Sequence, residues 1–139
     1  MISTVAVGTD GSTTADEAVK KAAEIARRFD ARLVLLSAFE DGRGAPAGDD
    51  IELQWASNPS ARVKSMLERT EADLRSGGIE CETLIGGGEP SEVLVRLAAD
   101  CGADVLVIGN KGMQRRVLGS VPNSVTHKAD CSVLVVKTT

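Results

Sequence analysis

The feature that most constrains the fold is an alternation of short apolar runs with longer segments of helical periodicity. Residues 33–36 and 105–108 are apolar at every position, which is typical of strands covered on both faces of a parallel sheet. Between such runs, apolar residues recur at intervals of three and four, as over 15–29 and 63–74. This alternation predicts right-handed crossovers and a single doubly wound α/β sheet with helices on both faces.

The predicted order begins and ends with a strand and places a helix between each pair of strands. We expect the strands at residues 4–8, 32–39, 79–85, 104–109 and 132–137. We expect the helices at residues 13–30, 59–78, 90–101 and 119–128. A long loop is expected at 40–58, with Trp55 as its packing anchor, and a glycine turn at 86–88. The length of 139 residues suits one domain, which we expect to span 1–139.

The charge and the aromatic content argue against nucleic acid as a partner. The net charge is −4, whereas proteins that bind the phosphate backbone present a basic surface. Only 2% of the residues are aromatic, so platforms on which unpaired bases stack are not expected either.

Cysteine usage and the apolar pattern predict a cytoplasmic protein without a membrane partner. Cys81, Cys101 and Cys131 are odd in number and form no CxxC pair, which favours a reducing compartment. Each is expected to be a small buried hydrophobe. No basic segment precedes an apolar run near Met1, and no stretch approaches the roughly 20 apolar residues of a membrane span.

Two glycine-bearing segments follow predicted strands, at the edge where doubly wound sheets bind their ligands. They are residues 8–12, Gly-Thr-Asp-Gly-Ser, and residues 109–112, Gly-Asn-Lys-Gly. Gly119 and Ser120 follow the second segment and begin a predicted helix. Glycine lets the backbone approach a ligand closely, and the free N–H groups at a helix start favour an anion.

Positive charge gathers beside the second segment. Lys111, Arg115 and Arg116 stand out in a chain that is otherwise acidic. Together these features suggest a phosphate cradle, while the alternative is that the glycines only form turns and the arginines are solvated. The familiar P-loop and the GxGxxG fingerprint after the first strand are both absent, so any phosphate contacts are of another type.

Four segments, in this order, resemble the universal stress protein family. Residues 5–12, VAVGTDGS, look like the family's opening strand and turn, and residues 86–94, GGGEPSEVL, are also similar. Residues 105–121, VLVIGNKGMQRRVLGSV, resemble the family's nucleotide signature, G-x2-G-x9-G followed by Ser or Thr. Residues 131–137, CSVLVVK, are similar to the family's C-terminal strand. The resemblance covers essentially the whole chain and indicates the ATP-binding subgroup.

The resemblance implies a five-stranded parallel sheet in the order 3-2-1-4-5, of the adenine nucleotide alpha hydrolase-like type. The nucleotide would lie across the ends of the first and fourth strands. Ala38, at the end of the second strand, would contribute to the adenine pocket, and Asp10 would lie near the adenine and the ribose.

The rest of the implied nucleotide site follows the fourth strand. Gly109 and Gly112 would line the path of the ribose and phosphates, and Gly119 and Ser120 would hold the phosphates. The full set of predicted nucleotide-binding residues is Thr9, Asp10, Gly11, Ser12, Ala38, Gly109, Lys111, Gly112, Met113, Arg115, Arg116, Gly119, Ser120 and Val121.

The chain departs from the family's signature at one place. Only six residues, 113–118, lie between Gly112 and Gly119, where the signature has nine. A deletion of three residues is close to one helical turn, so the loop would be tighter and the triphosphate pocket smaller. The implied cofactor is ATP, with Mg²⁺ as its companion ion, or a related adenine nucleotide. The short loop favours AMP or cyclic AMP.

The implied function is that of an adenine-nucleotide-binding regulatory protein of the stress response. We assign no catalytic and no metal-binding residues. His127 is the only histidine, and no nucleophile or His/Cys cluster has a suitable spacing. Two alternatives are a weak ATPase, with at most slow hydrolysis of ATP, and a dimeric interaction module whose nucleotide site is degenerate.

The C-terminal strand is the expected surface for a homodimer. In the order 3-2-1-4-5 the last strand is an edge, and an exposed edge offers unpaired N–H and C=O groups. Residues 131–136 contain no proline and no charge, so pairing with a second copy of the chain would protect them. The resemblance implies the same surface, since family members commonly dimerise through this strand.

Overall fold

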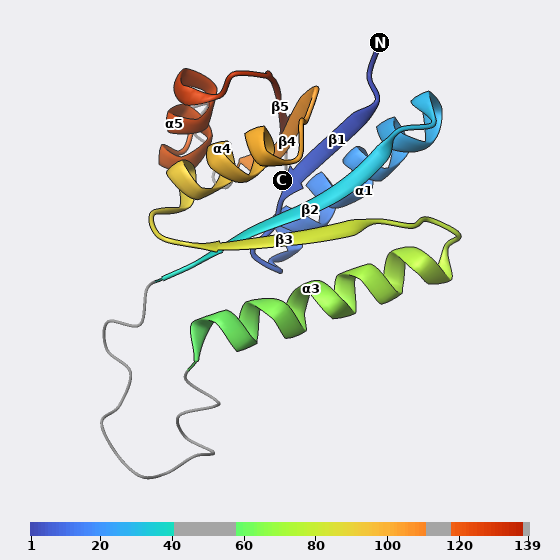
Figure 1. Ribbon diagram of the computed structural model, residues 1–139, viewed down its shortest axis with the longest axis horizontal. Helices are drawn as coiled ribbons and strands as arrows, with labels where there is room; N and C mark the ends of the chain where they lie inside the picture. Colours follow the sequence, from blue (N-terminus) through green and yellow to red (C-terminus); the bar gives the residue numbers. More distant parts are fainter. Residues whose placement is uncertain (41–57, 111–117, 138–139) are drawn as a thin grey trace, which may run out of the picture.

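The computed structural model describes residues 1–40, 58–110 and 118–137. Its five strands form one sheet in the order β3-β2-β1-β4-β5, and every pairing is parallel (Figure 1). The strands are β1 (Thr4–Gly8), β2 (Arg32–Phe39), β3 (Glu82–Gly87), β4 (Val105–Asn110) and β5 (Ser132–Lys137). The helices are α1 (Thr13–Phe29), α3 (Pro59–Ser76), α4 (Pro90–Asp100) and α5 (Ser120–Lys128). The predicted fold class and strand order are confirmed.

The helices cover both faces of the sheet, with α1 and α3 on one side and α4 and α5 on the other (Figure 1). Successive strand residues point to opposite faces. Leu35 of β2 therefore packs in the same cluster as Leu67 of α3, whereas Leu36 packs with Leu97 of α4 and Val125 of α5. This two-sided burial explains why the central strands are apolar at consecutive positions.

Helix α1 is fixed at both of its ends and against the sheet. The Ser12 hydroxyl accepts a hydrogen bond from the Ala15 amide at 3.1 Å, which caps the helix. Asp30 ends it in the left-handed conformation, with φ of 53°. A side chain at Gly109 would place its Cβ 3.1 Å from the Thr14 carbonyl oxygen. The glycine therefore lets the start of α1 rest directly on β4.

The third strand differs from the prediction. We expected a strand at 79–85 and a turn at 86–88, but β3 begins at Glu82 and includes Gly86 and Gly87. A Cβ at Gly86 would lie 2.7 Å from an Arg96 nitrogen and 2.9 Å from a Val93 methyl. Gly86 thus admits α4 close to the strand. Most of the predicted loop at 40–58, with its Trp55, lies outside the described residues.

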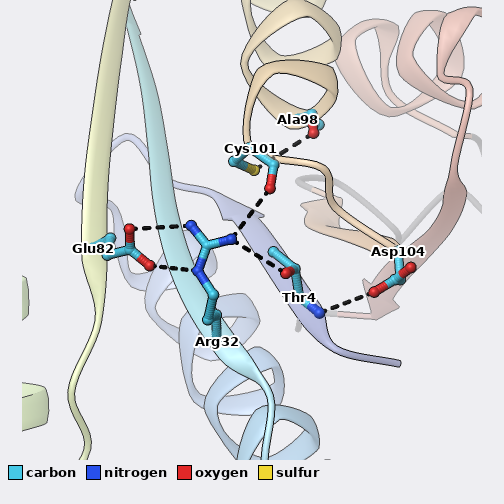
Figure 2. A network of polar contacts seen from close by, with 6 residues as sticks. All are labelled: Thr4, Arg32, Glu82, Ala98, Cys101 and Asp104. Carbon is cyan, nitrogen blue, oxygen red and sulfur yellow. Dashed lines mark hydrogen bonds and ion pairs between the residues drawn. The ribbon is translucent and has the colours of Figure 1, made fainter. Parts of the chain in front are cut away.

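A polar network joins the amino ends of β1, β2 and β3 to the end of α4 and to the loop before β4 (Figure 2). The Arg32 guanidinium donates from Nε and Nη2 to the Glu82 carboxylate, at 2.8 and 3.1 Å, and so links β2 to β3. Its Nη1 lies 3.5 Å from the Thr4 hydroxyl of β1 and 3.5 Å from the Cys101 carbonyl at the end of α4. The hydrogen bond from Arg32 lowers the pKa of Glu82.

Asp104 completes this amino-edge network. Its carboxylate accepts hydrogen bonds from the amides of Ser3 and Thr4, at 2.8 and 2.9 Å. These backbone hydrogen bonds, from Ser3 first, lower the pKa of Asp104. The loop before β4 is thereby attached to the start of β1.

Two further findings bear on the predicted partners. Within the described residues, no helix is long and apolar enough to cross a membrane. In the part of the chain that the structure describes, strand β5 is an edge of the sheet and pairs only with β4, with Lys137 opposite Asn110 in the register.

Candidate functional site

A cavity of about 470 Å³ opens at the carboxyl edge of the sheet, between the ends of β1, β2 and β4 and the start of α5. From β1 the chain first adds strands β2 and β3 on one side of the sheet and then β4 and β5 on the other. Open α/β sheets bind ligands at such a switch point, here between β1 and β4. The structure brings these predicted site residues together in its lining: Thr9, Asp10, Ser12, Ala38, Gly109, Gly119, Ser120 and Val121. Lys111, Gly112, Met113, Arg115 and Arg116 lie outside the described residues.

The turn after β1 is fixed by hydrogen bonds with β2 and within the turn itself. The Thr9 amide donates to the Leu36 carbonyl at 2.9 Å, and the buried Ser37 hydroxyl donates to the Thr9 carbonyl at 2.7 Å. The Asp10 carboxylate accepts from the Ser12 amide at 3.0 Å, an Asx turn. Asp10 is therefore held at the mouth of the cavity by its own backbone and by β2.

Gly11 does not line the cavity, although we predicted it among the binding residues. Its amide donates to the Thr9 hydroxyl at 3.1 Å, and its φ is +80°. A Cβ there would lie 2.8 Å from Cγ of Met66 on α3. The local structure requires glycine at this position for its conformation and for the close approach of α3.

The walls between the two ends of the cavity are apolar. Leu94 of α4 and Ile108 of β4 line it beside Gly8 and Ala38. A Cβ at Gly8 would lie 3.1 Å from a Leu94 methyl and 3.5 Å from an Ile108 methyl. Gly8 therefore lets these two side chains come together under the opening, where they offer a surface that suits a flat apolar ring.

The far end of the cavity is built from the last residue of β4 and the first turn of α5. Asn110 is completely buried, and its side-chain oxygen accepts a hydrogen bond from the Gly119 amide at 2.8 Å. Gly119 is the N-cap of α5, and its carbonyl accepts from the Asn123 amide at 2.9 Å. The start of α5 is thus attached to the central part of the sheet.

The helix starts differ in how their N–H groups are occupied. Side chains of Ser12, Asn58 and Glu89 cap α1, α3 and α4 respectively. Among the described residues no side chain caps α5. Since the first N–H groups of a helix lack intrahelical partners, the α5 start presents donors and the positive end of the helix dipole to the cavity.

The capped start of α4 carries a negative charge instead. The Glu89 carboxylate accepts from the amides of Ser91 and Glu92, at 3.1 and 3.0 Å, and from the Ser91 hydroxyl. The hydroxyl first, and then the two amides, lower the pKa of Glu89. The start of α5 is therefore the more favourable environment for an anion, since the start of α4 already carries the Glu89 carboxylate.

Several lining residues were missed by the sequence analysis: Gly8, Thr14, Ala15, Ser37, Pro90, Leu94, Ile108, Asn110 and Pro122. Asn110 lies inside the Gly-Asn-Lys-Gly segment, and that position was a usable signal. Ser37 carried none, because it lies within an apolar run and acts on a residue 28 positions away.

A second cavity of about 330 Å³ adjoins the first through Asp10 and Ala38. It lies between the end of β2 and the start of α3, with Arg62 and Met66 in its lining. The two cavities share the end at which the resemblance places the adenine.

Among the described residues, no group of three or more His, Cys, Asp or Glu side chains is placed to hold a metal ion. Burial raises the pKa of Cys81 to about 11, and burial is also the main cause that raises the pKa of Cys101 and Cys131. None of the three cysteines therefore has the lowered pKa of an activated nucleophile.

The comparisons with known proteins agree on one family. The sequence profile described as the universal stress protein family matches residues 1–137. A universal stress protein of Mycobacterium tuberculosis strain H37Rv is 38% identical over 146 aligned residues, covering 98% of this chain and 97% of that protein.

Solved structures give the same result. The crystal structure of a universal stress protein in complex with cAMP has a TM-score of 0.77 and 31% identity, and covers 99% of both chains. A universal stress protein family protein of Arabidopsis thaliana with AMP bound has a TM-score of 0.77 and 25% identity, covering 99% of this chain and 92% of that one. The chain described here therefore belongs to the universal stress protein family.

Proposed function

We propose that the protein binds one adenine nucleotide in the cavity at the carboxyl edge of the sheet and acts as a regulatory protein of the stress response. The observation that carries this proposal is the arrangement of the cavity's two ends. An apolar wall lies near Ala38, Leu94 and Ile108, and uncapped helix N–H groups lie at the start of α5. The apolar wall suits an adenine ring, and the helix start suits a phosphate group.

The nucleotide would lie with its base toward the first two strands and its phosphate toward α5. Asp10 and Ala38 would border the base and ribose, and Ser120 and Val121 would meet the phosphate. The two structural neighbours with cAMP and AMP support an adenine nucleotide as the ligand class. ATP, with Mg²⁺, is a further candidate ligand for the same cavity, although the short loop favours AMP or cyclic AMP over it.

Isothermal titration calorimetry tests this proposal directly. AMP, cyclic AMP and ATP are titrated into the protein, with GMP as the control for the base. We expect the adenine nucleotides to bind and GMP to bind at least tenfold more weakly. Mass spectrometry of any copurifying nucleotide gives an independent identification. Equal affinity for GMP, or no heat with any adenine nucleotide at millimolar concentration, would contradict the proposal.

We further propose that the protein is a homodimer through β5. This strand is an edge of the sheet, and Leu134 on it is 37% exposed. A second copy that pairs with β5 would supply hydrogen-bond partners to the edge and cover Leu134. We place the protein in the cytoplasm, a proposal supported by its three free cysteines.

A further inference from the structure

We propose that Asn110 is a positioning residue that fixes the start of α5 and thereby sets the affinity of the cavity for phosphate. This inference rests on the proposed function, because it assigns the phosphate to the α5 end. Asn110 is the only side-chain amide among the described residues that is buried.

The burial of this amide requires a reason. A primary amide removed from water costs free energy unless its polar atoms are hydrogen bonded. The Asn110 oxygen accepts from the Gly119 amide at 2.8 Å, across nine positions of sequence. The Asn110 backbone is itself fixed in β4, where it pairs with Lys137. A rigid strand therefore holds the N-cap residue of a helix.

The hydrogen bond also determines which N–H groups remain for a ligand. The Gly119 N–H is taken by Asn110, and Pro122, the third residue of α5, has no N–H. Among the first three residues of α5, Ser120 and Val121 therefore supply the backbone donors, and the Ser120 hydroxyl can add a third. The loss of the Asn110 contact would free the N-cap to rotate and would misalign both donors.

Preorganised donors bind an anion better than mobile ones, because no ordering cost is paid on binding. Asn110 should therefore contribute to the part of the binding affinity that comes from the phosphate and not to the part that comes from the base or ribose. The measure of this contribution is the ratio of the affinity for AMP to the affinity for adenosine, which differs from AMP only by the phosphate.

The first experiment compares this ratio in the unmodified protein, in Asn110→Ala and in Asn58→Ala, by calorimetry. Asn58 is the matched control, since its side chain caps α3 and does not line the 470 Å³ cavity. We expect Asn110→Ala to reduce the ratio about three- to tenfold, the loss expected for one hydrogen bond, with adenosine affinity unchanged. Asn58→Ala should lower thermal stability and leave the ratio unchanged.

A second experiment needs no ligand. Amide hydrogen exchange of Gly119, followed by NMR, should be slow in the unmodified protein and faster in Asn110→Ala. Asn110→Asp keeps a side-chain oxygen at the same position, so Gly119 should stay protected. Its carboxylate should nevertheless weaken AMP without weakening adenosine, because it places a negative charge beside the phosphate. This variant keeps the test decisive if Asn110→Ala does not fold.

The outcomes separate the two proposals. A ratio that Asn110→Ala and Asn110→Asp both leave unchanged overturns the role of Asn110 while adenine-nucleotide binding stands. An equal loss of adenosine and AMP affinity also overturns it, since that pattern indicates a general structural role. If the unmodified protein binds neither compound, the proposed function and this inference are both overturned.

Discussion

At the residue scale, Gly11 and Gly78 form a natural matched pair. Both have φ near +80°, but a Cβ at Gly11 would lie 2.8 Å from Met66 whereas a Cβ at Gly78 would have no heavy atom within 4 Å. We expect Gly78→Ala to lower the free energy of unfolding by about 1–2 kcal/mol, the cost of the left-handed conformation alone. Gly11→Ala should cost more, by the displacement of Met66.

Urea denaturation of the two variants measures the difference. Because Met66 is a flexible side chain, the excess for Gly11→Ala should stay within about 1–3 kcal/mol, the usual range for overpacking. An equal loss of stability in both variants would show that the contact with Met66 carries no strain.

Gly119→Val is the residue-scale test of the phosphate end. Gly119 is the N-cap of α5 and lines the cavity, so a branched side chain would stand in front of the helix N–H groups. We expect nucleotide binding to be abolished in calorimetry and the circular dichroism spectrum to stay unchanged. Unaltered affinity in a folded variant would remove this end of the cavity from the site.

At the element scale, the sequence predicted the strands from their apolar runs and not from the depth of their burial. Strands β1, β2 and β5 were predicted with their observed bounds, although β1 is buried at all five positions and β5 only at Val136. Strand β3 was placed too early because Gly86 and Gly87 are typical of turns. The role of Gly86, which admits Arg96 and Val93 of α4, depends on a contact that no local pattern contains.

The same distinction applies to the candidate site. Asp10 was predicted because it lies in a glycine-bearing segment directly after a strand, and Ser120 because it begins a helix after the second such segment. Ser37 and Asn110 were not, because each acts through one hydrogen bond to a residue outside its own element. Sequence therefore indicates where a ligand approaches the backbone, and the structure adds the side chains that position that backbone.

The shortened segment between Gly112 and Gly119 leads to an element-scale prediction. Six residues stand where the family's signature has nine, which leaves less wall for a terminal phosphate. We expect ATP to bind no more than about tenfold more tightly than AMP or cyclic AMP, a gap of ~1.4 kcal/mol. Calorimetry with the three nucleotides measures this gap. A much larger preference for ATP would show that the segment, or Lys111, reaches the terminal phosphate.

At the scale of the whole molecule, the free edge of β5 predicts the oligomeric state. Light scattering at micromolar concentration should give the mass of a dimer. Val135→Pro removes an amide donor from the strand, and Leu134→Glu places a charge at an exposed position on it. Both variants should shift the mass toward a monomer, with circular dichroism as the control for folding. A monomeric mass for the unmodified protein would contradict the dimer.

The amino-edge network predicts how stability depends on pH. Hydrogen bonds lower the pKa of Glu82 and of Asp104 below their ordinary values of 4.5 and 3.8. A lowered pKa in the folded state means that the stabilisation is complete above the ordinary value and is lost as the pH falls through the lowered one. The urea concentration at the unfolding midpoint should therefore decrease as the pH is lowered from 6 to 3. This decrease should be smaller in Asp104→Asn. An identical fall in the variant would exclude Asp104 as a contributor.

The parallel pairing of β5 with β4 places the beginning of the described chain at the amino ends of the strands and its last residues at the carboxyl ends. Lys137 lies opposite Asn110, beside the cavity, whereas Ser3 binds Asp104 at the far edge. A purification tag or a fluorescent reporter fused before Met1 would therefore leave the cavity open. The same fusion after residue 139 would follow β5 at the end of the sheet that carries the cavity, and it would also crowd the strand offered to a second copy. The choice of fusion end thus decides whether a reporter measures this protein's ligand or displaces it.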